Sequence, residues 1–233
     1  MDMSDEIIRQ AVASTQTLRP PRRSLDTFGT TNIYYYLLTE PAYGEMSGPE
    51  AETVIREGRV IAERPQVVTP YYLSHLQGFS PEARKYFEML IQEHGATTPG
   101  LFYKYRNEPK ELNIVTDSLY AVFEKLNAQI EERGDPLTSI IKGEDTLWDV
   151  SLMKFIFEIT RQSLPDNLNQ MGRQGRLKMD RHGVPADARV KIEELFYKVQ
   201  SGQGEPRELK YELDRWGVFN EYEDRFFNLF GSK

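Results

Sequence analysis

The stretch DTLWDVSLMKFIFEITRQSL, residues 145–164, decides the fold more than any other part of the chain. Its apolar residues recur at helical spacing and cover nearly all sides, which is typical of a helix buried in a protein core. Asp145 or Thr146 can cap the first turn, and Pro165 lacks the N–H that would continue the helix. We therefore predict a buried helix over residues 145–164, against which the other elements pack.

The composition is typical of a folded protein. The chain has 233 residues, of which 39% are hydrophobic and 28% charged, and it is long enough for one large domain or two small ones. It contains no cysteine, which excludes disulfides, thiolate catalysis and zinc–thiolate sites. The longest apolar run, residues 33–38, is far shorter than a membrane span, and the acidic N-terminus is unlike a signal peptide. These features predict a cytoplasmic protein without a membrane partner.

Strand signals are concentrated in the first half of the chain. NIYYYLLT, residues 32–39, is the clearest strand, and apolar residues on both its faces predict a central position. Residues 51–68 and 101–115 are predicted to form hairpins that turn at Glu57-Gly58 and at residues 107–110. A short helix with Pro49 at its first position and Gly58 just past its last position is an alternative to the first hairpin.

Helix signals dominate the second half. Helices are predicted over residues 4–15, 80–94, 117–133, 187–200, 206–216 and 219–230. The chain is therefore expected to be an α+β protein, with an antiparallel sheet or hairpins over about residues 30–115 packed with a predominantly helical second half. Residues 1–233 are expected to form a single globular unit, with a subdivision into 1–115 and 116–233 as the alternative.

Motifs of several common enzyme classes are absent from the sequence. It has no phosphate-binding G-x-x-x-x-G-K-[ST], no G-x-G-x-x-G, no G-x-S-x-G and no H-E-x-x-H. Its three histidines include no pair at metal-ligand spacing on one helix. This favours a non-enzymatic protein without excluding an enzyme, and no cofactor is expected.

One alternative is a small-molecule binder or enzyme with a tyrosine-lined pocket in the first half. Nine of the 13 tyrosines lie between residues 34 and 105. Tyr71 and Tyr72, beside His75, could supply stacking faces and hydroxyl groups to a planar ligand. Tyrosines also stabilise sheets by cross-strand pairing, which is the simpler interpretation.

A weaker alternative is a metal site at the start of the long helix. Glu144, Asp145 and Asp149 place three carboxylates there, and oxygen ligands of this kind suit magnesium. Acidic residues also stabilise a helix N-terminus without any metal, so capping is the simpler interpretation.

Residues 165–186 are predicted to form a long, basic loop. The window 161–191 holds seven Lys or Arg and three Asp, a net charge of +4, against −7 for the whole chain. Backbone amides near Gly172 and Gly175, together with neighbouring guanidinium groups, could hold phosphate oxygens. We predict that this loop contacts an acidic or phosphate-bearing partner, nucleic acid included, through Arg173, Arg176, Lys178 and Arg181. A solvated loop that pairs with the acidic remainder of the chain is the alternative.

Two further segments have simple expected roles. LRPPRR, residues 18–23, is predicted to be an extended connector whose arginines are solvated. The C-terminal RWGVFNEYEDRFFNLFGSK, residues 215–233, carries too much aromatic surface to remain exposed to water. We expect it to pack on its own domain, with a homo-oligomer or partner interface as the alternative.

Overall fold

The computed structural model describes residues 3–42, 51–69, 88, 91–93, 95 and 99–231. The chain forms two compact units, which are described separately. The first comprises Met1–Arg64 and Tyr103–Asn167, and the second comprises Pro65–Phe102 and Leu168–Lys233. No helix in the described part of the chain is both long and apolar enough to cross a bilayer.

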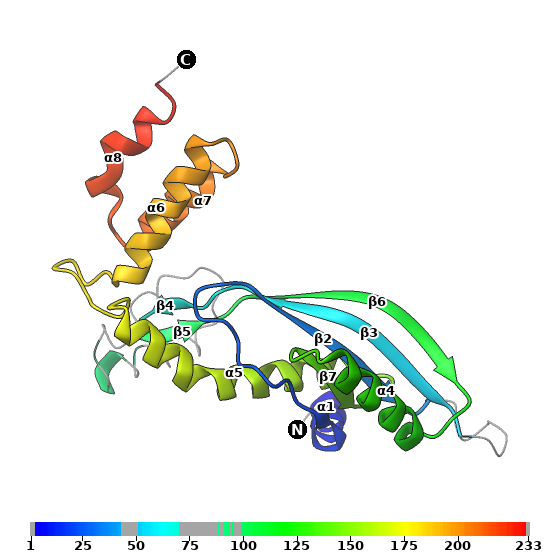
Figure 1. Cartoon of the computed structure of the whole chain (residues 1–233). Helices are drawn as coiled ribbons and strands as arrows, with labels where there is room; N and C mark the ends of the chain where they lie inside the picture. Colours follow the sequence, from blue (N-terminus) through cyan, green and yellow to red (C-terminus); the bar gives the residue numbers. More distant parts are fainter. Residues whose placement is uncertain are drawn as a thin grey trace. The chain divides into compact units, whose positions relative to one another are not determined.

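The first unit is built on a five-stranded mixed sheet of order β1-β7-β2-β3-β6 (Figure 1). β2 lies at its centre, parallel to β7 and antiparallel to β3, while β1 pairs with β7 and β6 with β3. The central position of β2 and the α+β class are confirmed. The strands are β1 (Gln16–Arg19), β2 (Thr31–Thr39), β3 (Thr53–Ala62), β6 (Tyr105–Val115) and β7 (Thr138–Lys142).

Helices cover both faces of this sheet. Tyr35 and Leu37 of β2 pack with α5 (Trp148–Arg173), whereas Leu38 packs with α4 (Leu119–Arg133). Successive side chains of a strand point to opposite faces, so α5 and α4 lie on opposite sides of the sheet. The long helix is a packing centre of the first unit, as predicted, but it is not buried on nearly all sides, because Met153 and Phe157 are 63% and 66% exposed.

α1 (Met3–Ser14) lies beside the first half of α5. The Thr15 hydroxyl, just after α1, donates to the Ser151 hydroxyl over 2.7 Å. The Lys154 amine donates to the carbonyls of Val12 and Thr15 over 2.9 and 2.7 Å. The bond to Val12 satisfies one of the free carbonyls in the last turn of α1.

Both predicted hairpins are wrong, as is the short helix before Gly58. β3 continues through Glu57-Gly58, and β6 continues through residues 107–110. Gly58 serves packing, because a Cβ atom there would lie 2.3 Å from the Tyr35 hydroxyl oxygen. Opposite it, Lys110 is an extra residue between the pairs Glu57–Glu111 and Gly58–Pro109. Glycine and proline thus mark a β-bulge here, and the sequence signals of a bulge resemble those of a turn.

α5 is longer than predicted. It continues through Pro165 to Arg173, so that residues 165–173 of the expected loop are helical. Pro165 and Arg161 are exposed, so the Arg161 carbonyl that loses its partner can bond to water instead. On the buried side, the Ser163 hydroxyl accepts the Leu25 N–H over 3.0 Å, which holds this stretch against the segment before β2.

In the part of the second unit that the structure describes, the helices α6, α7 and α8 follow the end of α5 and are accompanied by a two-stranded sheet. The helices share one core, which includes Ile192, Phe196 and Leu213. The predicted helices 187–200, 206–216 and 219–230 are confirmed to within two residues, whereas the predicted helix 80–94 lies mostly outside the described residues. The elements are β4 (Gln66–Val68), β5 (Gly100–Phe102), α6 (Ala186–Gln200), α7 (Pro206–Arg215) and α8 (Phe219–Asn228).

The aromatic C-terminus packs on its own unit. Trp216 and Phe226 are buried in the core of the second unit, and Arg225 lies 4.0 Å from the centre of the Phe196 ring. Phe227 and Phe230 remain 56% and 54% exposed. Self-association through these two rings stays a prediction.

Candidate anion-binding turn

Residues 173–185, between the end of α5 and the start of α6, form a compact segment termed here the basic turn. Asp180 organises it: its carboxylate accepts the backbone N–H groups of His182 and Val184 over 2.8 and 3.0 Å. The Asp180 N–H in turn donates to the Val184 carbonyl over 3.0 Å. An aspartate that bonds to the backbone just beyond it fixes a tight turn, so this segment is ordered by its own hydrogen bonds.

The glycines of the basic turn shape the backbone. Gly175 and Gly183 have φ angles of 70° and 72°, a left-handed conformation that favours glycine. The Gly175 N–H donates to the Gly172 carbonyl and the Arg176 N–H to the Met171 carbonyl, which closes the end of α5. The Gly175 amide predicted to cradle a phosphate is therefore used within the chain, and the expected contact with an anion rests on the side chains.

Arg176 differs from the other three predicted cations. Its guanidinium lies 3.7 Å from the carboxylate of Asp187, which is 1% exposed. The same carboxylate accepts the Val67 N–H over 3.3 Å. A buried carboxylate needs such partners, so Arg176 has an internal role that its sequence neighbours lack.

Arg173, Lys178 and Arg181 remain accessible. All three are exposed, and none forms an ion pair with any residue that the structure describes. Arg181 donates to the His182 ring over 3.1 Å. The structure thus presents three of the four predicted cations on an ordered turn, and no carboxylate of the described residues pairs with them.

Arg189 of α6 is a structural residue that sequence reasoning did not single out. Two of its nitrogens donate to one Asp180 oxygen over 2.8 and 2.6 Å. Its third nitrogen donates to the Glu221 carboxylate over 2.9 Å. Burial alone would lower the pKa of Arg189, but hydrogen bonds to Tyr222, Asp180 and Glu221 outweigh it and raise the pKa. Arg189 therefore ties the basic turn to α8.

The pKa of Asp180 responds to the same contacts. Burial alone would raise it, but the hydrogen bonds from Val184, Arg189 and His182 outweigh burial and lower it. Asp180 therefore stays ionised at neutral pH and holds the turn as an anion. Its hydrogen bonds go to Arg189 and the backbone, and not to Arg173, Lys178 or Arg181.

The structure does not gather the three carboxylates predicted as a weak metal site. Asp145 accepts hydrogen bonds from Thr39 and Arg56, both over 2.8 Å. Asp149 accepts the N–H of the residue that follows it. Among the described residues, no group of three His, Asp or Glu is arranged to hold a metal ion. Glu144 is exposed at the same helix start.

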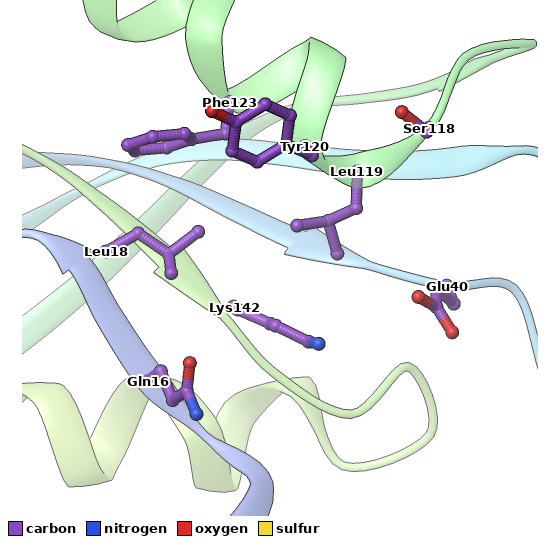
Figure 2. Close-up of a pocket in the computed structure, with 8 residues that line it drawn as sticks. All are labelled: Gln16, Leu18, Glu40, Ser118, Leu119, Tyr120, Phe123 and Lys142. Atoms are coloured by element: carbon purple, nitrogen blue, oxygen red, sulfur yellow. The ribbon is translucent and has the colours of Figure 1, made fainter.

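The predicted tyrosine-lined pocket of Tyr71, Tyr72 and His75 lies outside the described residues. The first unit has another pocket, of about 450 Å³, between α4 and the β1–β7 side of the sheet. Figure 2 shows the Lys142 side chain extending across it below Leu119. Its lining differs from the predicted one and comprises Gln16, Leu18, Glu40, Ser118, Leu119, Tyr120, Phe123 and Lys142.

No family model, curated protein or solved structure matches this chain.

Proposed function

We propose that the protein is a non-enzymatic interaction protein whose basic turn binds an acidic or phosphate-bearing partner. The observation that supports this is the trio of exposed cations, Arg173, Lys178 and Arg181, on a turn held by Asp180 and Arg189. Because the backbone is already ordered, binding an anion does not require folding of the segment, which lowers the entropic cost of association.

The overall charge of the chain sets the conditions for such binding. A net charge of −7 repels polyanions at long range. Attraction to the basic turn acts over about 8 Å at physiological ionic strength. Binding is therefore local and strongly weakened by salt, as expected when a few cations replace condensed counterions.

The side chains of the basic turn recognise charge rather than bases. Residues 173–185 contain no Phe, Tyr or Trp on which a base could stack, and their one imidazole, His182, accepts a hydrogen bond from Arg181. Arginine matches the paired oxygens of phosphate or carboxylate, while lysine acts as a point charge. A nucleic acid would thus be held by its phosphates, with little preference for sequence.

The test replaces Arg173, Lys178 and Arg181 together by alanine in the full chain. Binding is measured by fluorescence anisotropy with a labelled polyphosphate, a DNA duplex and a polyglutamate peptide over a range of salt concentrations. We expect weaker binding to at least one probe and a slope of log Kd against log salt that is lower by about 2 to 3, one unit per lost phosphate contact.

The matched control replaces three other exposed cations, Lys104, Lys198 and Arg207, and changes the net charge by the same amount. It should keep the wild-type affinity and slope. Equal losses in both triple variants would show that only net charge matters. Equal losses, or no salt-sensitive binding to any of the three probes, would refute the proposal.

A further inference from the structure

The strand β6 forms an open edge of the five-stranded sheet. It is 11 residues long and pairs with β3, and no other strand of the described chain lies on its outer side. Most of its residues are exposed. The opposite edge, β1, is short and irregular, with four residues and a register shift after Thr17. β6 is therefore the edge at which this sheet can extend.

The two halves of β6 are protected unequally. The first half carries Arg106, Glu108, Pro109 and the bulged Lys110, and charges, prolines and bulges are features that prevent edge strands from pairing. The second half, ELNIV at residues 111–115, has no proline, lysine or bulge. This second half is available for strand addition.

Two apolar residues of this half are exposed on the face that α5 covers elsewhere. In the register of β6 and β3, Leu112 lies opposite Arg56 and Ile114 lies opposite Val54. Arg56 lies opposite Leu37 of β2, and the Leu37 side chain packs with α5. Directly paired residues point to the same face. Leu112 and Ile114 are nevertheless 56% and 51% exposed, so α5 does not cover them.

α5 adds two exposed apolar residues on the side that faces β6. The Thr160 hydroxyl lies 2.5 Å from the Tyr105 hydroxyl of β6. Phe157 and Met153 precede Thr160 by three and seven residues, which places them on the same side of the helix. They are 66% and 63% exposed. Leu112, Ile114, Met153 and Phe157 together are termed here the β6 patch.

The sequence 111–115 is complementary to itself in an antiparallel pairing. With a two-fold axis at Asn113, Leu112 lies opposite Ile114 of a second copy, and Ile114 lies opposite Leu112 of that copy. Glu111 lies opposite Val115, so no like charges face each other. Cross-strand pairs of branched apolar residues stabilise a sheet, and opposed like charges destabilise it.

We infer that the protein forms a two-fold symmetric dimer in which the second halves of two β6 strands pair antiparallel, with Asn113 at the axis. The pairing covers the second half of both open edges and satisfies the free backbone groups there. Because the axis is perpendicular to the sheet, both copies of α5 lie on the same face. Met153 and Phe157 of each copy then flank the joined strands and add apolar area beyond the five paired residues.

The chain contains no cysteine, so a single introduced cysteine can form a disulfide only with the same residue of a second copy. The rate of cross-linking then reports the distance between these two residues. Asn113→Cys places two sulfur-bearing residues directly opposite each other, with Cβ atoms about 5 Å apart, close to disulfide geometry. Glu111→Cys, on the same strand and face, separates the two copies of residue 111 by four residues along the strand, about 13 Å. Under mild oxidation we expect Asn113→Cys to form a linked dimer at least about tenfold faster than Glu111→Cys.

A second measurement uses charge instead of a thiol. Asn113→Lys opposes two ammonium groups at the axis and should weaken the dimer at least tenfold in sedimentation equilibrium, whereas Asn220→Lys, an exposed position of α8, should leave it unchanged. A chain that is monomeric up to its solubility limit would overturn the inference. Equal cross-linking rates of the two cysteine variants would also overturn it. A dimer that Asn113→Lys does not weaken would overturn it as well, and is the result expected if Phe227 and Phe230 join the two copies instead.

Discussion

Two segments of the chain are rich in arginine, the connector at residues 18–23 and the basic turn at residues 173–185, and they use this charge differently. In the connector, Arg19 and Arg22 both reach Glu131 of α4 over 2.5 Å, and Arg23 pairs with Asp26 over 3.3 Å. In the basic turn, three of the four predicted cations have no carboxylate partner among the described residues. The connector was expected to be solvated, yet it is the segment whose cations are neutralised.

Local charge density does not distinguish cations that form ion pairs within the fold from cations that remain accessible. The difference is whether the fold places a carboxylate next to the cation. Glu131 is 112 residues from Arg19 in the sequence, so no local pattern indicates the pair. At the basic turn, Asp180 pairs with Arg189, and Asp187 at the start of α6 pairs with Arg176.

The largest expected effect concerns Arg19, whose side chain is 9% exposed. Arg19→Ala removes hydrogen bonds to Glu131 and Asn127 and a buried aliphatic stem, so we expect the free energy of unfolding to fall by about 2 to 3 kcal/mol. Arg173→Ala, at an exposed cation, should change it by less than about 0.5 kcal/mol. Urea denaturation of both variants checks this. Similar losses in the two variants would contradict the distinction between the segments.

A smaller effect is expected at Asp180. Asp180→Ala removes the acceptor for two backbone N–H groups and the partner of Arg189, and should cost about 1 to 2 kcal/mol. It should also weaken anion binding, although it removes a negative charge, because the turn loses its shape. Asp180→Asn keeps an acceptor oxygen and should bind anions at least as well as the wild type.

Anisotropy with the polyphosphate probe separates these outcomes. Stronger binding by Asp180→Ala would mean that net charge, and not the geometry of the basic turn, governs affinity.

The smallest expected effect is a pH dependence in the connector. Burial alone would raise the pKa of Glu131, but hydrogen bonds from Arg22 and Arg19 outweigh it and lower the pKa. Because the pKa of Glu131 is lower in the folded than in the unfolded state, its ionised form stabilises the fold. This contribution is complete above the pKa of an ordinary glutamate, and it is lost as the pH falls through the pKa of Glu131 in the folded state.

Urea midpoints measured between about pH 7 and pH 3 should therefore fall toward acid. The fall should be shallower in Arg19→Ala, which lacks one of the groups that lower the Glu131 pKa. A parallel fall in both proteins would show that other carboxylates dominate the acid response.

Elements whose boundaries are encoded locally could be predicted from the sequence. α4 is capped by the Ser118 side chain, which accepts the Ala121 N–H, and it ends at Gly134 with a φ angle of 65°. α7 and α8 are separated at Gly217, where φ is 67°. In each case one residue type suits one backbone position, and that preference does not depend on the rest of the fold.

Elements that depend on distant partners were missed. β1 and β7 are four and five residues long, and their sequences, QTLR and TSIIK, carry little signal on their own. β7 becomes a strand because it fits between β1 and β2, where Ile140 and Ile141 are fully buried on opposite faces. The bulge at Lys110 was mistaken for a turn for the same reason, since only pairing with β3 distinguishes the two.

The sequence by itself determined the α+β class, the central strand, most helix boundaries and the presence of an excess of positive charge between α5 and α6. Only the tertiary structure decided which of those cations remain accessible, because neutralisation requires an acid within a few ångströms and the chain brings such acids from far along the sequence. Only the tertiary structure also showed that β6 is an open edge. Whether a strand is exposed depends on the elements that pack beside it, and the residues of the strand alone do not determine those elements.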